Sequence, residues 1–357
     1  MEKEILPLAC EFIGIRSDPD NQPALEEILE LALSHLQDYS IERFERNGVK
    51  SALIHNQPKR PSRFKVLLNG HLDVIPAKAD QYSARIEGSK LYGAGSMDMK
   101  SNVSCLIAAF KSVANSVNYP LGLQLVTDEE TGGFNGTKLQ VDEGVRADFI
   151  IAGESTNFNI VNKAKGVFLA KISSSGETAH GAYPWRGTNA IWEMVEFLNA
   201  LKERYPIPTK EVIGTTVNLA RIKTKNEVYN KIPDDCDIFL DVRHLQEDAD
   251  TVVASIEDLL PAGFTLSIEA KEPGLSVSEN NPNIESIRRV TEKCINRTIT
   301  CYMANGTSDA RHFTRVGCDG IEFGPTGGGI GTDNEWVDIP SLFTFHNILK
   351  EYLYSIG

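Results

Sequence analysis

The sequence lacks the long apolar runs and the basic clusters that mark membrane and nucleic-acid-binding proteins. No apolar stretch approaches the ~20 residues that span a bilayer. Acidic residues (49) outnumber basic ones (36), the net charge is −13, and no Lys/Arg-rich run is present. This balance argues against nucleic acid or an anionic membrane as a partner.

Signals for secretion are also missing. The chain starts with an acidic, interrupted segment, which is unlike a secretory signal. Its six cysteines are scattered and form no C-x-x-C pair, a usage typical of reduced thiols in the cytosol. We therefore expect a cytoplasmic protein.

What is present indicates a folded protein of about two domains, because 357 residues exceed the ~150 typical of one. Three short apolar runs, Phe64–Leu68, Leu121–Val126 and Phe149–Ala152, alternate with helical patterns such as Val103–Val113. This alternation predicts an α/β fold with a mainly parallel, mixed sheet. We expect the first run to end at the turn residues Asn69 and Gly70.

The pattern changes between residues 165 and 277. There the order of predicted elements is β-α-β-β-α-β, which is typical of a small ferredoxin-like α+β domain with helices on one face of its sheet. The α/β pattern returns from about residue 278. We therefore predict one domain of residues 1–164 and 278–357, interrupted by an inserted domain of residues 165–277.

Acidic side chains and one histidine follow the predicted strands and loops. They are His71, Asp73, Asp98, Glu129, Glu130 and Glu154. In open α/β sheets ligands bind beyond the carboxyl ends of the strands, so these side chains should converge. Carboxylates that converge repel one another, and one imidazole with several carboxylates suits Zn²⁺ or a similar divalent ion.

Each residue also has an ordinary structural interpretation. A lone H-x-D is more often structural, and Glu129-Glu130 could be a solvated surface. Asp98 could cap a helix and Asp73 could belong to a turn. The ordered set favours the metal site over these separate interpretations.

The motifs that carry these residues resemble the M20 metallopeptidase and amidohydrolase family. They are H-L-D-V-I-P from His71, L-Y-G-A-G-S-M-D-M-K up to Lys100, D-E-E-T-G-G from Asp128 and G-E-S around Glu154. The stretch Gly176–Ala190 in the inserted region is similar to the family's dimerisation-domain motif, and Gly306–Arg311 to the desuccinylase version of a late loop. The resemblance implies a zinc-peptidase-like catalytic domain with an inserted dimerisation or lid domain.

The resemblance also implies a role for each residue. His71 and Glu154 would bind one zinc ion, Asp98 would bridge two ions, and Glu130 would bind the second; Co²⁺ or Mn²⁺ could replace zinc. Glu129 would be the general base, with Asp73 orienting the first histidine. His180 of a partner subunit would stabilise the oxyanion, so a homodimer is expected. Arg311 would grip a substrate carboxylate and Asn230 would help to hold the substrate.

These roles predict a hydrolase that cleaves the amide bond of a small N-acyl amino acid by metal-activated water. The alternative within the family is a metallo-carboxypeptidase or dipeptidase. An arginine fork matches a carboxylate, which is why Arg311 would favour substrates that carry one.

The sequence departs from the family at its last zinc ligand. The family histidine should fall at Gly331, four residues before Glu335, and glycine has no ligating side chain. Three interpretations follow: one zinc ion that still supports hydrolysis, a substitute ligand such as Asp333, or a catalytically impaired small-molecule-binding homologue. Three ligands and a water suffice for catalytic zinc in other enzymes, which favours the first.

Overall fold

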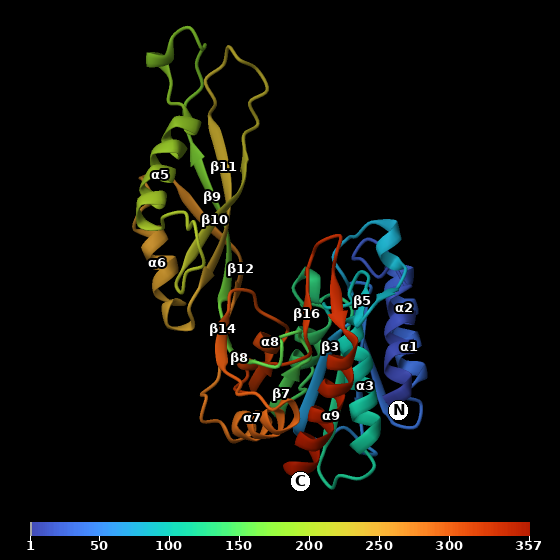
Figure 1. The fold of residues 1–357 in the computed structure, drawn as a ribbon. Helices are drawn as coiled ribbons and strands as arrows, with labels where there is room; N and C mark the ends of the chain where they lie inside the picture. Colours follow the sequence, from blue (N-terminus) through green and yellow to red (C-terminus); the bar gives the residue numbers. More distant parts are fainter. Residues whose placement is uncertain (1) are drawn as a thin grey trace. The chain divides into compact units, whose positions relative to one another are not determined.

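The computed structural model describes residues 2–357, and the chain forms two compact units. Unit 1 comprises residues 2–163 and 275–357, and unit 2 comprises Ala164–Gly274. The sequence boundaries at 165 and 277 lie within three residues of these borders. Figure 1 follows the chain by colour through each unit.

The helices and strands of unit 1 alternate along the chain. Its helices are α1 (Glu2–Ile13), α2 (Gln22–Ser34), α3 (Lys100–Val113), α4 (Thr137–Asp142), α7 (Pro282–Ile295), α8 (Ala310–Thr314) and α9 (Ile339–Ser355). Its strands are β1 (Ser40–Arg46), β2 (Val49–His55), β3 (Phe64–His71), β4 (Arg85–Glu87), β5 (Lys90–Tyr92), β6 (Leu121–Val126), β7 (Ala147–Ala152), β8 (Ile160–Ala164), β13 (Leu275–Ser276), β14 (Cys301–Ala304), β15 (Asp319–Glu322), β16 (Gly327–Gly328) and β17 (Trp336–Asp338).

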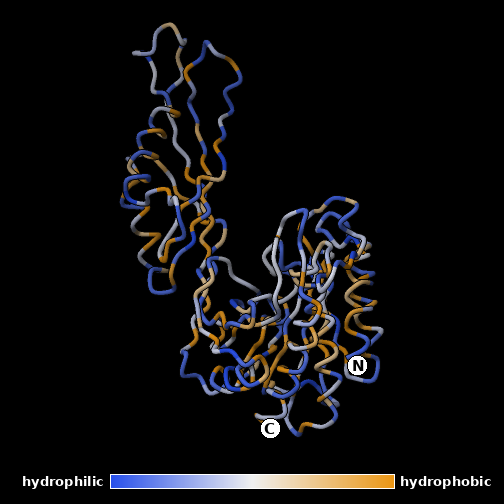
Figure 2. Tube along the Cα trace, viewed as in Figure 1, coloured by the Kyte–Doolittle hydropathy of each residue, from blue (hydrophilic) through white to orange (hydrophobic). Residues whose placement is uncertain are grey.

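A mixed sheet forms the centre of unit 1, in the strand order β1-β2-β6-β3-β7-β15-β8-β13, with β14 paired to β8. Its middle strands β6, β3, β7 and β15 run parallel, and β1, β2 and β8 pair antiparallel at the margins. Helix α3 packs against α1, α9 and β3, and nearly all of its side chains are buried. Hydrophobic residues follow the central strands in Figure 2. The predicted α/β fold with a mainly parallel central sheet is confirmed.

Strand β3 is longer than predicted. Asn69 and Gly70 do not end it, because β3 pairs with β6 as far as His71. A Cβ at Gly70 would lie 2.9 Å from Val103 Cγ2 of α3, so the glycine permits close packing of helix on strand and forms no turn. The longer strand makes His71 its last residue, at the carboxyl edge of the sheet.

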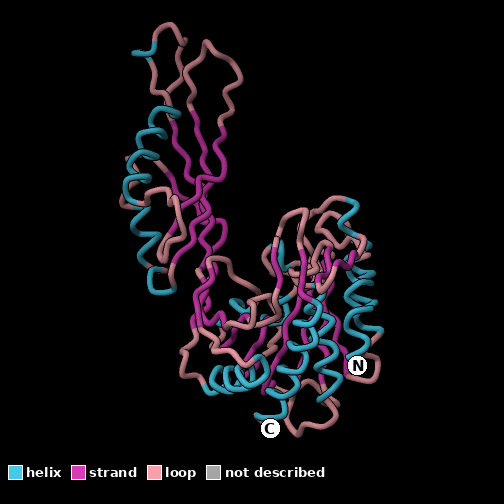
Figure 3. The backbone as a smooth tube through the Cα atoms, viewed as in Figure 1, coloured by secondary structure: helices cyan, strands magenta, loops and turns pink. Residues whose placement is uncertain are grey.

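Unit 2 contains the predicted β-α-β-β-α-β order. Its elements are β9 (Gly166–Ser175), α5 (Ala190–Arg204), β10 (Thr216–Lys223), β11 (Asp235–His244), α6 (Thr251–Glu257) and β12 (Thr265–Glu272). The four strands form one antiparallel sheet in the order β10-β11-β9-β12. Alternate residues of β9 and β11 are buried, and Figure 3 shows both helices over the same face. The core of unit 2 therefore lies between that face and the helices.

Within residues 2–357, no helix is both long enough and apolar enough to cross a membrane.

Candidate metal centre and active site

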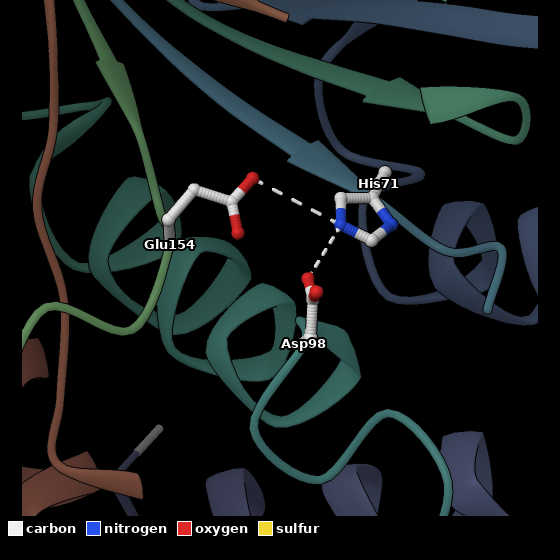
Figure 4. A group of neighbouring side chains, drawn as sticks. All are labelled: His71, Asp98 and Glu154. Carbon is white, nitrogen blue, oxygen red and sulfur yellow. Dashed lines mark hydrogen bonds and ion pairs between the residues drawn. The ribbon is translucent and has the colours of Figure 1, made fainter. Parts of the chain in front are cut away.

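Three of the predicted ligands meet at the carboxyl edge of the central sheet. His71 ends β3, Glu154 follows β7 and Asp98 precedes α3. One ligand atom from each lies within 4.8 Å of the others. His71 Nε2 is 2.9 Å from Asp98 Oδ1 and 3.9 Å from Glu154 Oε1. Figure 4 marks both contacts with dashed lines. Parallel β3 and β7 bring two of these residues to one point, since their ends lie at the same edge of the sheet.

Asp73 connects the histidine to the next acidic segment. Its main-chain oxygen accepts a hydrogen bond from His71 Nδ1 at 3.0 Å, and its carboxylate Oδ1 is 3.5 Å from the same nitrogen. Its Oδ2 accepts the backbone N–H of Glu130 at 2.9 Å. The predicted orienting contact is thus made mainly by the backbone of Asp73, while its side chain fixes the Glu130 segment.

Glu129 and Glu130 lie in a short helical turn, Glu129–Thr131, directly after β6. Glu129 lines a cleft of about 320 Å³ together with Asp98 and Glu154. Glu130 instead lines a neighbouring cleft of about 430 Å³, and Asp98 lines both. The two adjacent glutamates therefore face different sides of Asp98.

The carboxylates of the site are buried and lie close to one another, and both conditions affect their protonation. Burial raises the pKa of Glu129 and of Glu154 well above the usual range, and neighbouring carboxylates add to the effect. Burial also raises the pKa of Glu130 to about 7. Burial alone would lower the pKa of His71, but hydrogen bonds to Asp73 and Asp98 raise it well above its ordinary value. A bound cation would counter the repulsion that raises the carboxylate pKa values.

Gly331 lies where the missing ligand was expected. It lines the 430 Å³ cleft with Asp98 and Glu130, and its φ of +68° is in the left-handed region. Asp333 lines the same cleft, but its carboxylate forms an ion pair with Lys78 and its side chain is 58% exposed. Among the described residues, the group that could hold an ion is His71, Asp98 and Glu154, and it does not include Asp333.

Arg311 is buried close to Glu129, which lines the 320 Å³ cleft. Its Nη2 donates to Gly132 O at 2.6 Å, and its Nη1 donates to Ser308 O at 2.9 Å and to Thr307 O at 3.3 Å. Its Nη1 is also 4.0 Å from Glu129 Oε1. These contacts are with the protein itself, so a grip on substrate carboxylate stays a prediction.

His180 and Asn230 both belong to unit 2, where they lie side by side. His180 forms an isolated β-bridge with Lys231, and the N–H of Gly181 donates to Asn230 O at 2.8 Å. Both predicted residues are exposed. Two motifs about 50 residues apart in the sequence thus form one surface of unit 2.

Sequence reasoning missed Glu335 as a functional residue and used it only to place the absent histidine. Its buried carboxylate accepts three backbone N–H groups of the Asp98 loop: Met97 at 2.7 Å, Asp98 at 3.0 Å and Gly95 at 3.1 Å. The sequence signal that could have identified Glu335 was its position, four residues after Gly331. Glu335 therefore positions a proposed metal ligand without contacting the ion site itself.

A parallel-centred α/β unit with an acidic, histidine-containing site at its carboxyl edge defines a candidate metal-dependent hydrolase. The sequence matches the family described as peptidase family M20/M25/M40 over residues 67–355, and the chain belongs to this family. It is accordingly a metal-dependent hydrolase of amide or peptide bonds.

Individual relatives agree with this membership. The chain is 26% identical over 351 residues to a succinyl-diaminopimelate desuccinylase of Helicobacter hepaticus, covering 89% of this chain and 87% of the relative. It is 26% identical to the enzyme of the same name from a Nitratiruptor species, covering 99% and 100%.

Solved structures share the fold. The aminopeptidase PepT of Bacillus cereus matches with a TM-score of 0.81 at 18% identity, covering 100% of this chain and 99% of that one. An M20 family metallo-carboxypeptidase of Sulfolobus solfataricus matches with a TM-score of 0.79 at 16% identity, covering 99% and 100%. At these identities the likeness shows a common fold that includes the inserted domain.

Proposed function

We propose that this protein is a zinc-dependent amidohydrolase that removes the acyl group from a small N-acyl amino acid. The observation that carries the proposal is the convergence of His71, Asp98 and Glu154, with Glu129 on the same cleft. The relatives named as desuccinylases, matched over most of their length, support an N-acyl amino acid over a peptide.

The residues present fit a divalent cation. Because the Asp73 carbonyl can only accept, His71 Nδ1 must carry a proton. In the neutral ring Nε2 then presents a lone pair to the Asp98 carboxylate 2.9 Å away, and two lone pairs repel. A proton or a metal ion must lie between them, and one imidazole nitrogen with two carboxylate oxygens is a familiar zinc set.

In this proposal the bound ion and Glu129 have separate chemical roles. When bound, the ion supplies Lewis-acid polarisation of the scissile carbonyl and makes water more acidic. Glu129 removes a proton from the attacking water and delivers it to the departing amine nitrogen. Burial raises the pKa of Glu129, which suits a carboxylate that must hold this proton between the two steps.

One tightly held ion is the stoichiometry that we propose. On the other side of Asp98, Glu130 is the remaining predicted ligand, Gly331 offers no side chain, and Asp333 is engaged by Lys78. Two carboxylates without an imidazole hold zinc less firmly than the complete set on the His71 side.

A homodimer through unit 2 forms part of the proposal, with His180 and Asn230 reaching the cleft of a partner. Strand β10 is an edge strand whose Leu219 is 39% exposed and whose Ile222 is 54% exposed. On helix α5, Trp192 is 67% exposed. An unpaired edge with apolar neighbours favours pairing with a second chain. A cytoplasmic location likewise remains a prediction.

Metal analysis combined with a substrate panel tests the function. We expect about one zinc per chain, consistent with a three-ligand site, and metal-dependent turnover of N-succinyl or N-acetyl amino acids, with Co²⁺ and Mn²⁺ as substitutes. Glu129→Gln should keep the metal and lose about 10²–10⁴-fold in kcat. Glu27→Gln, an exposed change on α2, is the control. Faster cleavage of dipeptides would favour the peptidase, and metal-free protein without turnover would favour the impaired binding homologue.

A further inference from the structure

We propose that the 430 Å³ cleft beside Gly331 binds the acyl group of the substrate and selects an uncharged, apolar acyl chain. This inference rests on the proposed hydrolase function, because it assigns one half of the substrate to one half of the site. The preference differs from what the relatives named as succinyl-diaminopimelate desuccinylases suggest, since a succinyl group carries a carboxylate.

The two clefts meet beside the proposed ion site, because Asp98 and Ile330 line both of them. A substrate whose scissile carbonyl lies at the ion therefore has one cleft for each of its halves. Arg311 Nη1 is 4.0 Å from Oε1 of Glu129, which lines the 320 Å³ cleft. A guanidinium suits a carboxylate, so the amino-acid half of the substrate belongs on that side. The 430 Å³ cleft then remains for the acyl half.

The lining of the 430 Å³ cleft is rich in apolar residues. They are Val74, Ile75, Pro76, Ala77, Ala94 and Ile330. Ile75 is 40% exposed and Ile330 is 57% exposed, so large apolar side chains on its walls remain in contact with water. An apolar chain that enters the cleft removes part of this surface from water, which is favourable. The volume also falls in the range that is usual for small-molecule sites.

Gly331 leaves this space open. A Cβ at Gly331 would lie 3.2 Å from Ile75 Cδ1, and both residues line the cleft. A longer side chain at this position would therefore project towards Ile75 and narrow the cleft. The glycine that removes the expected metal ligand thus leaves room for a different occupant.

The charges around the cleft disfavour an anionic acyl group. Its lining contains the carboxylates of Asp98, Glu130, Asp333 and Glu335. Among the described residues that line it, Lys78 alone is cationic, and Lys78 already forms an ion pair with Asp333. A succinyl carboxylate would add a further negative charge to this lining, and like charges repel. An uncharged chain avoids that repulsion.

Contacts between the two walls hold the cleft in shape. One wall is the segment 74–81 and the other is the segment 330–335. The ion pair of Lys78 with Asp333 joins them, and Gln81 Nε2 donates to Thr332 O at 3.0 Å. A cleft whose walls are already joined needs little ordering when a ligand binds, which favours affinity.

A panel of acyl groups on one amino acid tests the preference in the wild-type protein. The amino acid is the one whose N-acetyl derivative is hydrolysed fastest. Through acetyl, butyryl and hexanoyl, kcat/KM should rise about fourfold for each added methylene. The 4-methylpentanoyl group matches succinyl in shape without its charge, and kcat/KM should be at least about tenfold higher for it. Faster hydrolysis of the succinyl or a 6-aminohexanoyl compound, or no rise with chain length, would overturn the proposal.

A pair of isoleucine variants locates the preference in the cleft. In Ile75→Asn, the ratio of kcat/KM for the hexanoyl compound to that for the acetyl compound should fall at least about tenfold. Ile86→Asn is the matched control, because Ile86 in β4 is 51% exposed and lines neither cleft. The control should keep the wild-type ratio. An equal ratio in Ile75→Asn and Ile86→Asn would contradict the assignment of the acyl group to this cleft.

Calorimetric binding to Glu129→Gln gives a readout that does not need turnover. N-hexanoylglycine should bind at least about tenfold more tightly than N-acetylglycine and with a more negative heat-capacity change. Equal affinities, or binding of neither compound, would refute the acyl site whether or not the protein hydrolyses amides. Tighter binding of the hexanoyl compound, together with a wild-type protein that hydrolyses no amide, would refute the proposed function alone.

Discussion

The hydrogen bonds between the Glu335 carboxylate and the Asp98 loop predict how much stability unit 1 loses when that carboxylate is replaced. In Glu335→Gln, the amide oxygen can keep the two N–H groups of Met97 and Asp98, but the NH₂ group would face the N–H of Gly95. Losing one charge-assisted bond costs about 1.5–3 kcal/mol, and making the other two neutral costs about 1 kcal/mol in total. Burial raises the pKa of Glu335, so replacing the charged carboxylate with a neutral amide recovers part of this cost. The net expectation is about 1.5–3 kcal/mol of lost stability in unit 1.

The assay can be confined to unit 1. Trp336 is its single tryptophan, because Trp185 and Trp192 lie in unit 2 and are exposed. In a background with both exchanged for Phe, urea unfolding followed by Trp336 fluorescence reports on the neighbourhood of Glu335. Zinc affinity should also fall about 10–100-fold, as for other residues that orient ligands. Equal unfolding midpoints and equal zinc affinities for Glu335→Gln and Glu27→Gln would refute the reasoning.

Three further predictions follow from other parts of the chain. Gly331→His should raise the zinc content measured by elemental analysis from one towards two per chain. A Cβ at this position meets only Ile75 Cδ1 at 3.2 Å, although the left-handed φ costs about 1 kcal/mol. Unchanged stoichiometry would show that the missing histidine ligand was assigned to the wrong position. Burial lowers the pKa of His346, so the unfolded chain protonates this imidazole near pH 6.5 and the folded chain does so only at lower pH. The free energy of unfolding should therefore fall as the pH falls below about 6.5, and it should fall less in His346→Gln. Parallel profiles of unfolding free energy against pH for the two proteins would contradict this prediction. Trp192→Glu should shift the sedimentation of a dimer towards the monomer, whereas a wild-type protein that is already monomeric and active would exclude the dimer.

The fold and the convergence of His71, Asp98 and Glu154 were predictable because both depend on patterns within short segments. His71 and Glu154 each follow an apolar run, and parallel strands place such ends together. Asp98 was predictable from its motif. For these residues, the local sequence is enough to predict that the side chain lies at the carboxyl edge of the sheet.

Glu335 and Arg311 were harder because their partners are main-chain atoms of distant segments. Glu335 binds N–H groups more than 230 residues earlier in the chain. Arg311 binds a carbonyl whose direction depends on the backbone angles of Gly132. A guanidinium suits carboxylates and carbonyls alike, so its side-chain chemistry does not reveal these carbonyl contacts, and the expected grip on a substrate carboxylate stays a prediction.

The chain enters and leaves unit 2 at points that lie close together in space. Strands β8 and β13, which precede and follow the inserted unit, are neighbours in the central sheet. A Cβ at Gly274 would collide with the carbonyl oxygen of Ala164, so the chain leaves unit 2 where it entered. A short hairpin connection could therefore replace the whole insert, and every proposed metal ligand and the proposed general base would remain in unit 1. Unit 2, which contains His180 and Asn230, is in this sense a separable insert, so changes within it could alter what the protein recognises without moving the proposed metal ligands.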